Sequence, residues 1–193
     1  MLQNQALAES ASARPQPSAA VPAPAVSPMA MADHRLSWTE CHQLTGLLAD
    51  AVAAAQCTVI AGISRSGLVP AVMLSHALGI RDFAVLDLRR TVSDAVHSQK
   101  RPPLLCDAMN LGALANRRVL LVDDIVGAGA TLVAARALLE GLASQVVTAA
   151  LVYNRANDPE GRAAAALDHH ACLVHGWVEF PWECKDLREA HHA

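Results

Sequence analysis

One stretch of the chain decides its fold: Val119-Leu120-Leu121-Val122-Asp123-Asp124-Ile125-Val126-Gly127-Ala128-Gly129-Ala130-Thr131. Four aliphatic residues end in two adjacent carboxylates, and a turn of small residues then leads to a threonine. A short apolar run bounded by turn residues is typical of a buried strand, and small residues before a helix let backbone N–H groups close on an anion. The stretch therefore predicts a buried strand, an anion-binding turn and a helix that begins near Thr131.

The paired acids leave two interpretations open. Carboxylates beside a phosphate site can accept hydrogen bonds from a sugar diol or help to hold Mg²⁺. Alternatively, the stretch is an acidic strand end followed by an ordinary tight turn. No lysine follows the glycines, which excludes a Walker loop, and Gly127-x-Gly129 lacks the third glycine of a dinucleotide-binding turn. The form of the stretch favours a sugar-phosphate site.

Strands and helices alternate on both sides of this stretch. Short apolar runs predict strands near residues 57–61, 83–86, 119–122 and 146–153. A capping box of Ser37 and Glu40 predicts the start of a helix that reaches Val52, and further helices are expected over 68–78 and 130–142. Residues 90–116 are polar and without a clear period, which predicts a long loop. The alternation predicts an α/β fold with a mostly parallel sheet flanked by helices, whose ligand lies outside the carboxyl ends of the strands.

Length and composition limit the class of protein. The 193 residues suffice for one domain, and residues 1–34, rich in alanine and proline, predict a disordered tail before a domain at 35–193. An alternative is that translation starts at Met29 or Met31. A formal net charge of -3 without a basic stripe argues against nucleic acid, and no apolar run is long enough for a membrane span. Five scattered cysteines without a Cys-x-x-Cys motif favour a cytoplasmic protein.

The decisive stretch resembles the phosphoribosyl pyrophosphate signature of the type I phosphoribosyltransferase family. The resemblance covers residues 36–185 and implies that family's core, with a small C-terminal hood from about 154 to 193. It implies that Asp123 and Asp124 hold the ribose 2′- and 3′-hydroxyls and, partly through the substrate, Mg²⁺. The 5′-phosphate would be wrapped by Ile125, Val126, Gly127, Ala128, Gly129, Ala130 and Thr131.

A second stretch, Gly62-Ile63-Ser64-Arg65-Ser66-Gly67-Leu68-Val69-Pro70, resembles the pyrophosphate loop of the same family. The resemblance implies that Ser64, Arg65, Ser66 and Gly67 face the leaving pyrophosphate. An arginine suits phosphate because its charge is permanent and its fork binds two oxygens. The alternative is a surface arginine in a strand-to-helix turn. The loop at about 90–110 occupies the place of the family's mobile loop.

The scarcity of aromatic residues, 3% of the chain, makes their cluster near the C-terminus informative. Trp177-Val178-Glu179-Phe180-Pro181-Trp182-Glu183 resembles the base-binding segment of xanthine–guanine phosphoribosyltransferases. This resemblance implies that Trp177 stacks on a purine, that Val178 and Glu183 contact it or its neighbourhood, and that Trp182 packs. Arg155 falls where those enzymes carry a lysine that contacts the purine 6-oxo group.

The resemblance as a whole implies an enzyme that transfers a 5-phosphoribosyl group from phosphoribosyl pyrophosphate to a nucleobase. A 6-oxopurine (guanine, xanthine or hypoxanthine) is the expected acceptor, purine salvage the expected role, and a homodimer or homotetramer the expected assembly. One departure leaves alternatives open, because Gly127 stands where many 6-oxopurine enzymes carry an aspartate. The chain could be a binding or regulatory protein with little turnover, and the arginine at 155 also allows a non-purine acceptor. A metal site in Asp168-His169-His170-Ala171-Cys172 and His175 is a weaker hypothesis.

Overall fold

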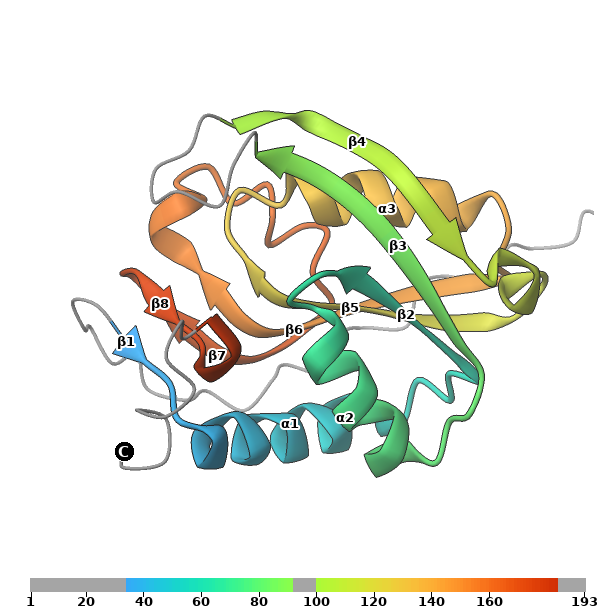
Figure 1. Ribbon diagram of the computed structural model, residues 1–193, viewed down its shortest axis with the longest axis horizontal. Coiled ribbons are helices and arrows are strands. Elements are labelled where there is room, and N and C mark those ends of the chain that lie inside the picture. The colour runs from blue at the N-terminus through green and yellow to red at the C-terminus, as the bar shows by residue number, and fades with distance from the viewer. Residues whose placement is uncertain (1–33, 92–99, 184–193) are drawn as a thin grey trace, which may run out of the picture.

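The computed structural model describes residues 34–91 and 100–183, and its centre is a six-stranded sheet (Figure 1). The strand order is β4-β3-β2-β5-β6-β7, and every neighbouring pair is parallel except β3 and β4, which are antiparallel. The strands are β2 (Val59–Ser64), β3 (Phe83–Thr91), β4 (Lys100–Met109), β5 (Arg118–Val126), β6 (Gln145–Asn154) and β7 (His169–Val174). The predicted α/β class with a mostly parallel sheet is confirmed.

Helices cover both faces of this sheet. The helices α1 (Trp38–Ala53) and α2 (Leu68–Leu78) lie on one face, and α3 (Ala130–Glu140) lies on the other (Figure 1). The predicted capping box is present, since Ser37 Oγ accepts from the Glu40 backbone N–H and the Glu40 carboxylate accepts from the Ser37 N–H. Within the described residues, no helix is both long and apolar enough to cross a membrane.

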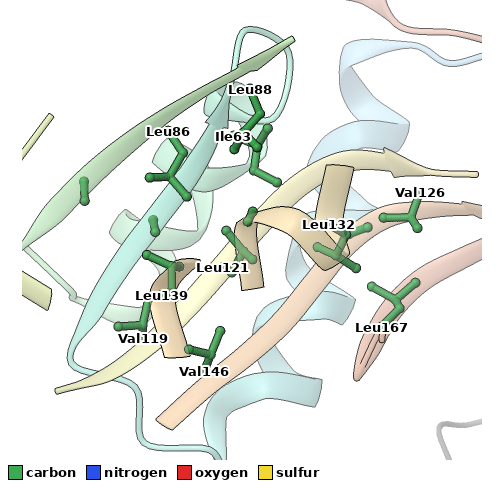
Figure 2. Packing of buried hydrophobic residues seen from close by; sticks show 14 of the residues in the cluster. Ile63, Leu86, Leu88, Val119, Leu121, Val126, Leu132, Leu139, Val146 and Leu167 are labelled. Carbon is green, nitrogen blue, oxygen red and sulfur yellow. The ribbon is translucent and has the colours of Figure 1, made fainter. Parts of the chain in front are cut away.

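The strand β5 lies in the middle of the sheet and contributes side chains to both cores. Val119 and Leu121 pack with α3 in one cluster, part of which Figure 2 shows, whereas Leu120 and Val122 pack with α1 and α2 in the other. All four side chains are fully buried. Because successive side chains of a strand point to opposite faces, the two acids that follow are directed to opposite sides of the sheet.

The predicted long loop at 90–116 is wrong over much of its length. The strand β3 extends to Thr91, β4 pairs with it in antiparallel register, and η1 (Leu111–Leu114) follows. The pair Pro102-Pro103 lies in β4, which is possible because an edge strand has one side free of ladder hydrogen bonds. Residues 92–99, inside the predicted mobile loop, lie outside the described residues.

The C-terminal part contributes to two sheets. The strand β7 belongs to the central sheet, although it falls within the predicted hood. The strand β8 (Val178–Glu179) pairs in parallel with β1 (His34–Arg35) to form a separate two-stranded sheet. Of the predicted tail at 1–34, only His34 lies within the described residues, so the disorder of that tail stays a prediction.

Replacing Leu121 by alanine tests the core around β5. Since the side chain is fully buried and the strands on both sides limit collapse of the cavity, we expect a loss of about 2–5 kcal/mol in the free energy of unfolding. Urea denaturation measures this loss. The matched control is Leu104→Ala on β4, where the side chain is 65% exposed and the change should stay within about 0.5 kcal/mol. Equal effects of the two substitutions would contradict the assigned core.

Candidate active site

A cavity of about 320 Å³ lies at the carboxyl ends of β5 and β6, beside the start of α3. Its lining combines acids, a turn of small residues, amides and aromatic rings. The lining residues are Arg90, Asp123, Ile125, Val126, Gly127, Ala128, Gly129, Ala130, Thr131, Leu132, Asn154, Asn157, Trp177, Val178, Phe180 and Glu183. This is the edge of a parallel sheet at which ligands bind in open α/β folds.

The turn between β5 and α3 forms one wall of the cavity. Gly129 is the N-cap of α3 with φ of 73°, a left-handed conformation that favours glycine. A Cβ there would also lie 2.8 Å from the backbone Cα of Ala163, so no larger residue fits. All residues of Gly127–Thr131 line the cavity, and the first turn of a helix offers unpaired N–H groups and a partial positive charge. This wall is suited to a phosphate.

Asp123 and Asp124 lie at the point where β5 reaches the cavity. Asp123 lines the cavity, whereas Asp124 is 6% exposed and lies on the side of Cys41 in α1. Burial, followed by the charge of its neighbour, holds the pKa of Asp123 well above the usual range of a carboxyl. Burial likewise raises the pKa of Asp124 to about 6, and the charge of Glu183 adds to this effect. Ionisation of the pair is therefore unfavourable, and hydroxyl donors or a cation at this site would favour it.

The acids fit a magnesium ion that is held largely by a substrate. Their oxygens are ligands that Mg²⁺ prefers, and the raised pKa values reflect charge that the protein leaves uncompensated. Within residues 34–91 and 100–183, no group of three His, Cys, Asp or Glu side chains is arranged to hold a metal by itself. This also leaves the histidine-rich segment at 168–175 without a metal-binding arrangement in the described part of the chain.

The predicted pyrophosphate loop packs directly against the acid pair. Gly67 ends the turn before α2, and a Cβ on it would lie 2.8 Å from Asp123 Oδ1 and 2.6 Å from the Ile63 carbonyl oxygen. Ser64 Oγ donates to Asp87 Oδ1 at 3.3 Å, which ties this loop to β3. The bond between Ser64 and Arg65 is cis. Two segments that are about sixty residues apart in the sequence thus meet at one point, although Ser64, Arg65, Ser66 and Gly67 do not line the cavity itself.

Aromatic residues form the opposite end of the cavity. Trp177 lines it and is 51% exposed, while Val178 and Phe180 line it and are buried. Trp182 instead stacks on Phe180, with ring centroids 4.6 Å apart and an angle of 13° between the planes. The carboxylate of Glu183 also lines the cavity and accepts from the Phe180 backbone N–H at 3.0 Å. A half-exposed indole ring in a cavity wall is a suitable surface for stacking with a flat ligand.

At the end of β6, the structure places Asn154 rather than Arg155 in the cavity lining. Arg155 Nη2 donates to the Pro159 carbonyl at 3.4 Å, within its own segment. Asn154 is 5% exposed, and its Nδ2 donates to the Gly176 carbonyl at 2.7 Å, directly before Trp177. Asn154 was not among the residues predicted from the sequence. The strand β6 is buried at every position from 146 to 154, so the signal that could have found Asn154 was a polar residue at the end of this apolar run.

Two further lining residues, Asn157 and Arg90, are not among the site residues predicted from the sequence. Asn157 belongs to η2 (Arg155–Asn157), a single turn after β6. Arg90 lies near the end of β3. Nothing in the periodicity of either segment indicates that these side chains line the same cavity as Asp123, because the contact depends on how the strand ends are arranged in space.

The comparisons with known proteins agree with this geometry. A model of the phosphoribosyl transferase domain matches residues 33–189. This chain belongs to the phosphoribosyltransferase family. It is a transferase of this kind, with the type I fold, and the family binds phosphoribosyl pyrophosphate and a base. A search of curated proteins finds no significant match.

Several solved structures are similar to that of this chain. The chain is similar to a purine phosphoribosyltransferase from Pyrococcus horikoshii, with a TM-score of 0.66 and 27% identity, covering 81% of this chain and 97% of that one. A hypothetical protein from Neisseria gonorrhoeae with bound ppGpp has a TM-score of 0.65 and 18% identity, covering 83% and 94%. The Helicobacter pylori xanthine-guanine-hypoxanthine phosphoribosyltransferase has a TM-score of 0.58 and 17% identity, covering 83% and 99%. These last two similarities concern the fold alone.

Replacing Gly67 by alanine tests the contact between the two loops. A Cβ would meet backbone atoms, the Ile63 oxygen at 2.6 Å and Asp123 Cα at 2.9 Å, so the loop must shift. We expect the KM for phosphoribosyl pyrophosphate to rise at least tenfold in steady-state assays. The control is Gly46→Ala in α1, where a Cβ meets nothing within 4 Å and helix propensity adds roughly 0.5–1 kcal/mol of stability. An unchanged KM in the Gly67 variant would contradict the contact.

The pH dependence of stability tests the strained acids. A carboxyl group with a higher pKa in the folded state binds its proton more tightly when folded. Its favourable contribution is therefore complete below pH 4 and is lost as the pH rises through about 6. We expect the double variant Asp123→Asn and Asp124→Asn to melt roughly 2–8 °C above the wild type at pH 8, and near it at pH 4.5. Calorimetry measures both, with exposed Asp50→Asn as the control for lost surface charge. A constant difference across pH would refute the assignment.

Proposed function

We propose that this phosphoribosyltransferase transfers the 5-phosphoribosyl group to a nitrogen of a purine, with guanine, xanthine or hypoxanthine as acceptor, and so serves purine salvage. One observation carries the proposal: the start of α3, Asp123 and Trp177 line a single cavity of about 320 Å³. A ligand made of a phosphate, a sugar diol and a flat base needs these three surfaces side by side: the helix start for the phosphate, Asp123 for the diol and Trp177 for the base. The 27% identity to a purine phosphoribosyltransferase supports a purine.

In the proposed reaction, the bond between ribose C1 and a pyrophosphate oxygen breaks and a bond between C1 and the base nitrogen forms. Pyrophosphate leaves with the bonding electron pair, and the proton of the base nitrogen passes to solvent. Backbone N–H groups of Gly127–Thr131 hold the 5′-phosphate, and Asp123 accepts from the ribose hydroxyls. The side chain of Arg65 lies on the loop that receives the pyrophosphate, and Arg90 lines the cavity near the end of β3.

Catalysis in this scheme comes from positioning and electrostatics. The ribose carries positive charge as the C1–O bond breaks, and the two acids stabilise that charge when they are ionised. Mg²⁺, when bound, neutralises the departing pyrophosphate. Trp177 holds the base in a stacked orientation, which brings its nitrogen close to C1 and avoids the entropic cost of aligning two free reactants.

A second candidate function rests on Gly127. No side chain at this position can accept the proton of the base, and general base catalysis contributes roughly 10²–10⁴ in rate. A protein of this fold that binds phosphoribosyl pyrophosphate or a nucleotide with little turnover is therefore the alternative.

Release of pyrophosphate in the presence of Mg²⁺ and single bases separates these functions. We expect release with guanine, xanthine or hypoxanthine and none with uracil or orotate. The variant Asp123→Asn with Asp124→Asn should lose at least 100-fold in rate while its far-ultraviolet circular dichroism stays unchanged. The control is Asp50→Asn on α1. Full activity of the double variant would overturn the catalytic assignment, and tight binding without release in the wild type would favour the alternative.

A further inference from the structure

The side chain of Asn157 lies directly over Gly127 in the phosphate-binding turn. A Cβ on Gly127 would be 3.0 Å from the Asn157 Cβ, 3.6 Å from its Cγ and 3.4 Å from its Nδ2. Gly127 is not among the residues with positive φ, so the backbone conformation does not require glycine there. The space that a side chain of residue 127 would enter is therefore taken by an amide from another element, η2, thirty residues later.

Asn157 is held in this place from both sides. On one side, the Asn154 side-chain oxygen accepts from the Ala156 N–H at 3.2 Å and caps η2. On the other side, the Asp158 carboxylate is 3% exposed and accepts from the Tyr153 hydroxyl at 2.7 Å and the Ala163 N–H at 2.9 Å. Burial would raise the pKa of Asp158, but these hydrogen bonds lower it overall.

The same anchor also reaches the phosphate-binding turn. Ala163 is fully buried, and its Cα and Cβ lie against Gly129, as close as 2.8 Å from the position of a Cβ there. Asp158 thus fixes the segment that follows Asn157 against the turn that begins α3. As a result, η2 and the turn form one wall, and the position of Asn157 relative to the 5′-phosphate site is set.

We propose that Asn157 is a specificity-determining residue, which hydrogen-bonds the edge of the acceptor base from over Gly127. The proposal rests on the proposed transfer to a base. An amide carries both donors and an acceptor but takes up no proton near neutral pH, so it distinguishes bases by their hydrogen-bonding pattern and not by removing a proton. Asn157 lines the cavity that Trp177 also lines, and its exposed position leaves the amide accessible to a ligand.

Paired ligands test this role. Guanosine, xanthosine, inosine and adenosine monophosphates carry a base, and ribose 5-phosphate shares their sugar and phosphate without one. For the nucleotide that the wild type binds most tightly, we expect Asn157→Ala to weaken binding at least fivefold in titration calorimetry. Binding of ribose 5-phosphate should stay within twofold. The matched control is Glu160→Gln, an exposed residue of the same segment paired with Arg162, which should change neither affinity.

A second variant adds a readout that a structural role would not change. Asn157→Asp places a titratable carboxylate over Gly127. The ratio of the nucleotide affinities of this variant and the wild type should therefore change between about pH 4 and 6, while the same ratio for ribose 5-phosphate should not.

The outcomes separate this proposal from the proposed function. Equal weakening of nucleotide and ribose 5-phosphate by Asn157→Ala would overturn the role in specificity and indicate a role in the turn. Unchanged affinity for both, or a wild type that binds no nucleotide, would overturn it as well. A wild type that releases no pyrophosphate with any base would refute the transfer reaction. Even then, the effect of Asn157→Ala on the ratio of the affinities for nucleotide and ribose 5-phosphate would decide the role of Asn157.

Discussion

The end of β5 is the constraint on which the rest of the structure depends. This strand has hydrogen-bonded neighbours on both sides and a run of fully buried aliphatic residues, and it delivers two adjacent carboxylates to the edge of the sheet. Register holds Asp123 opposite Ala150, so the acids cannot withdraw into solvent without moving the core. Loss of hydration is the main reason why both pKa values are raised; the charge of Asp124 adds to the effect at Asp123, and the charge of Glu183 adds to it at Asp124. The fold therefore maintains two carboxyl groups whose ionisation is unfavourable, and in the proposed function the ligand supplies the compensating groups, a common trade of stability for function.

The walls of the cavity come from distant segments, and a few polar contacts hold them together. The Asn154 amide joins the end of β6 to Gly176, and the His34 N–H donates to the Trp177 carbonyl at 2.7 Å, so β1 supports the aromatic end. The Asp158 carboxylate ties η2 to the segment packed on Gly129. Since these contacts are made by backbone groups and short side chains, they place the walls with little freedom. A cavity built in this way is organised before its ligand arrives.

The sequence predicted the parts of the fold that local chemistry determines. Apolar runs, the Ser37 capping box and the turn to α3 are short-range patterns, and the structure has each of them. The antiparallel β4 was missed because its polar composition and Pro102-Pro103 are unusual for a strand, and its edge position, which tolerates them, is a property of the tertiary structure.

In the candidate site, too, some residues were predictable from local sequence and others depend on the tertiary structure. The turn at 127–131 and the two acids were recognisable because one continuous segment contains them. Asn154 and Asn157 were not, since an asparagine at the end of a strand or in a single turn is ordinary, and only the arrangement of β6, η2 and the start of α3 brings both amides to one cavity. The residue that lines the cavity is Asn154, whereas the sequence predicted Arg155, its neighbour in the chain. Asn154 is the last residue of β6, whereas Arg155 already belongs to η2, so the two side chains start from different elements.

The two amides differ in how strongly they can discriminate between ligands. Asn154 is 5% exposed and already has partners at Gly176 and Ala156, so a ligand group that fails to match its remaining N–H leaves a buried donor unpaired. Such a group costs about 1–3 kcal/mol, whereas water replaces a lost partner at the exposed Asn157 at smaller cost. In the proposed function, Asn157 therefore selects among bases through a hydrogen bond to the base edge, and Asn154 adds a penalty for a ligand group that leaves its buried donor unpaired. In the proposed function, phosphate affinity comes from backbone N–H groups of Gly127–Thr131 and not from the two amides, so a change of acceptor base leaves the phosphoribosyl donor site intact.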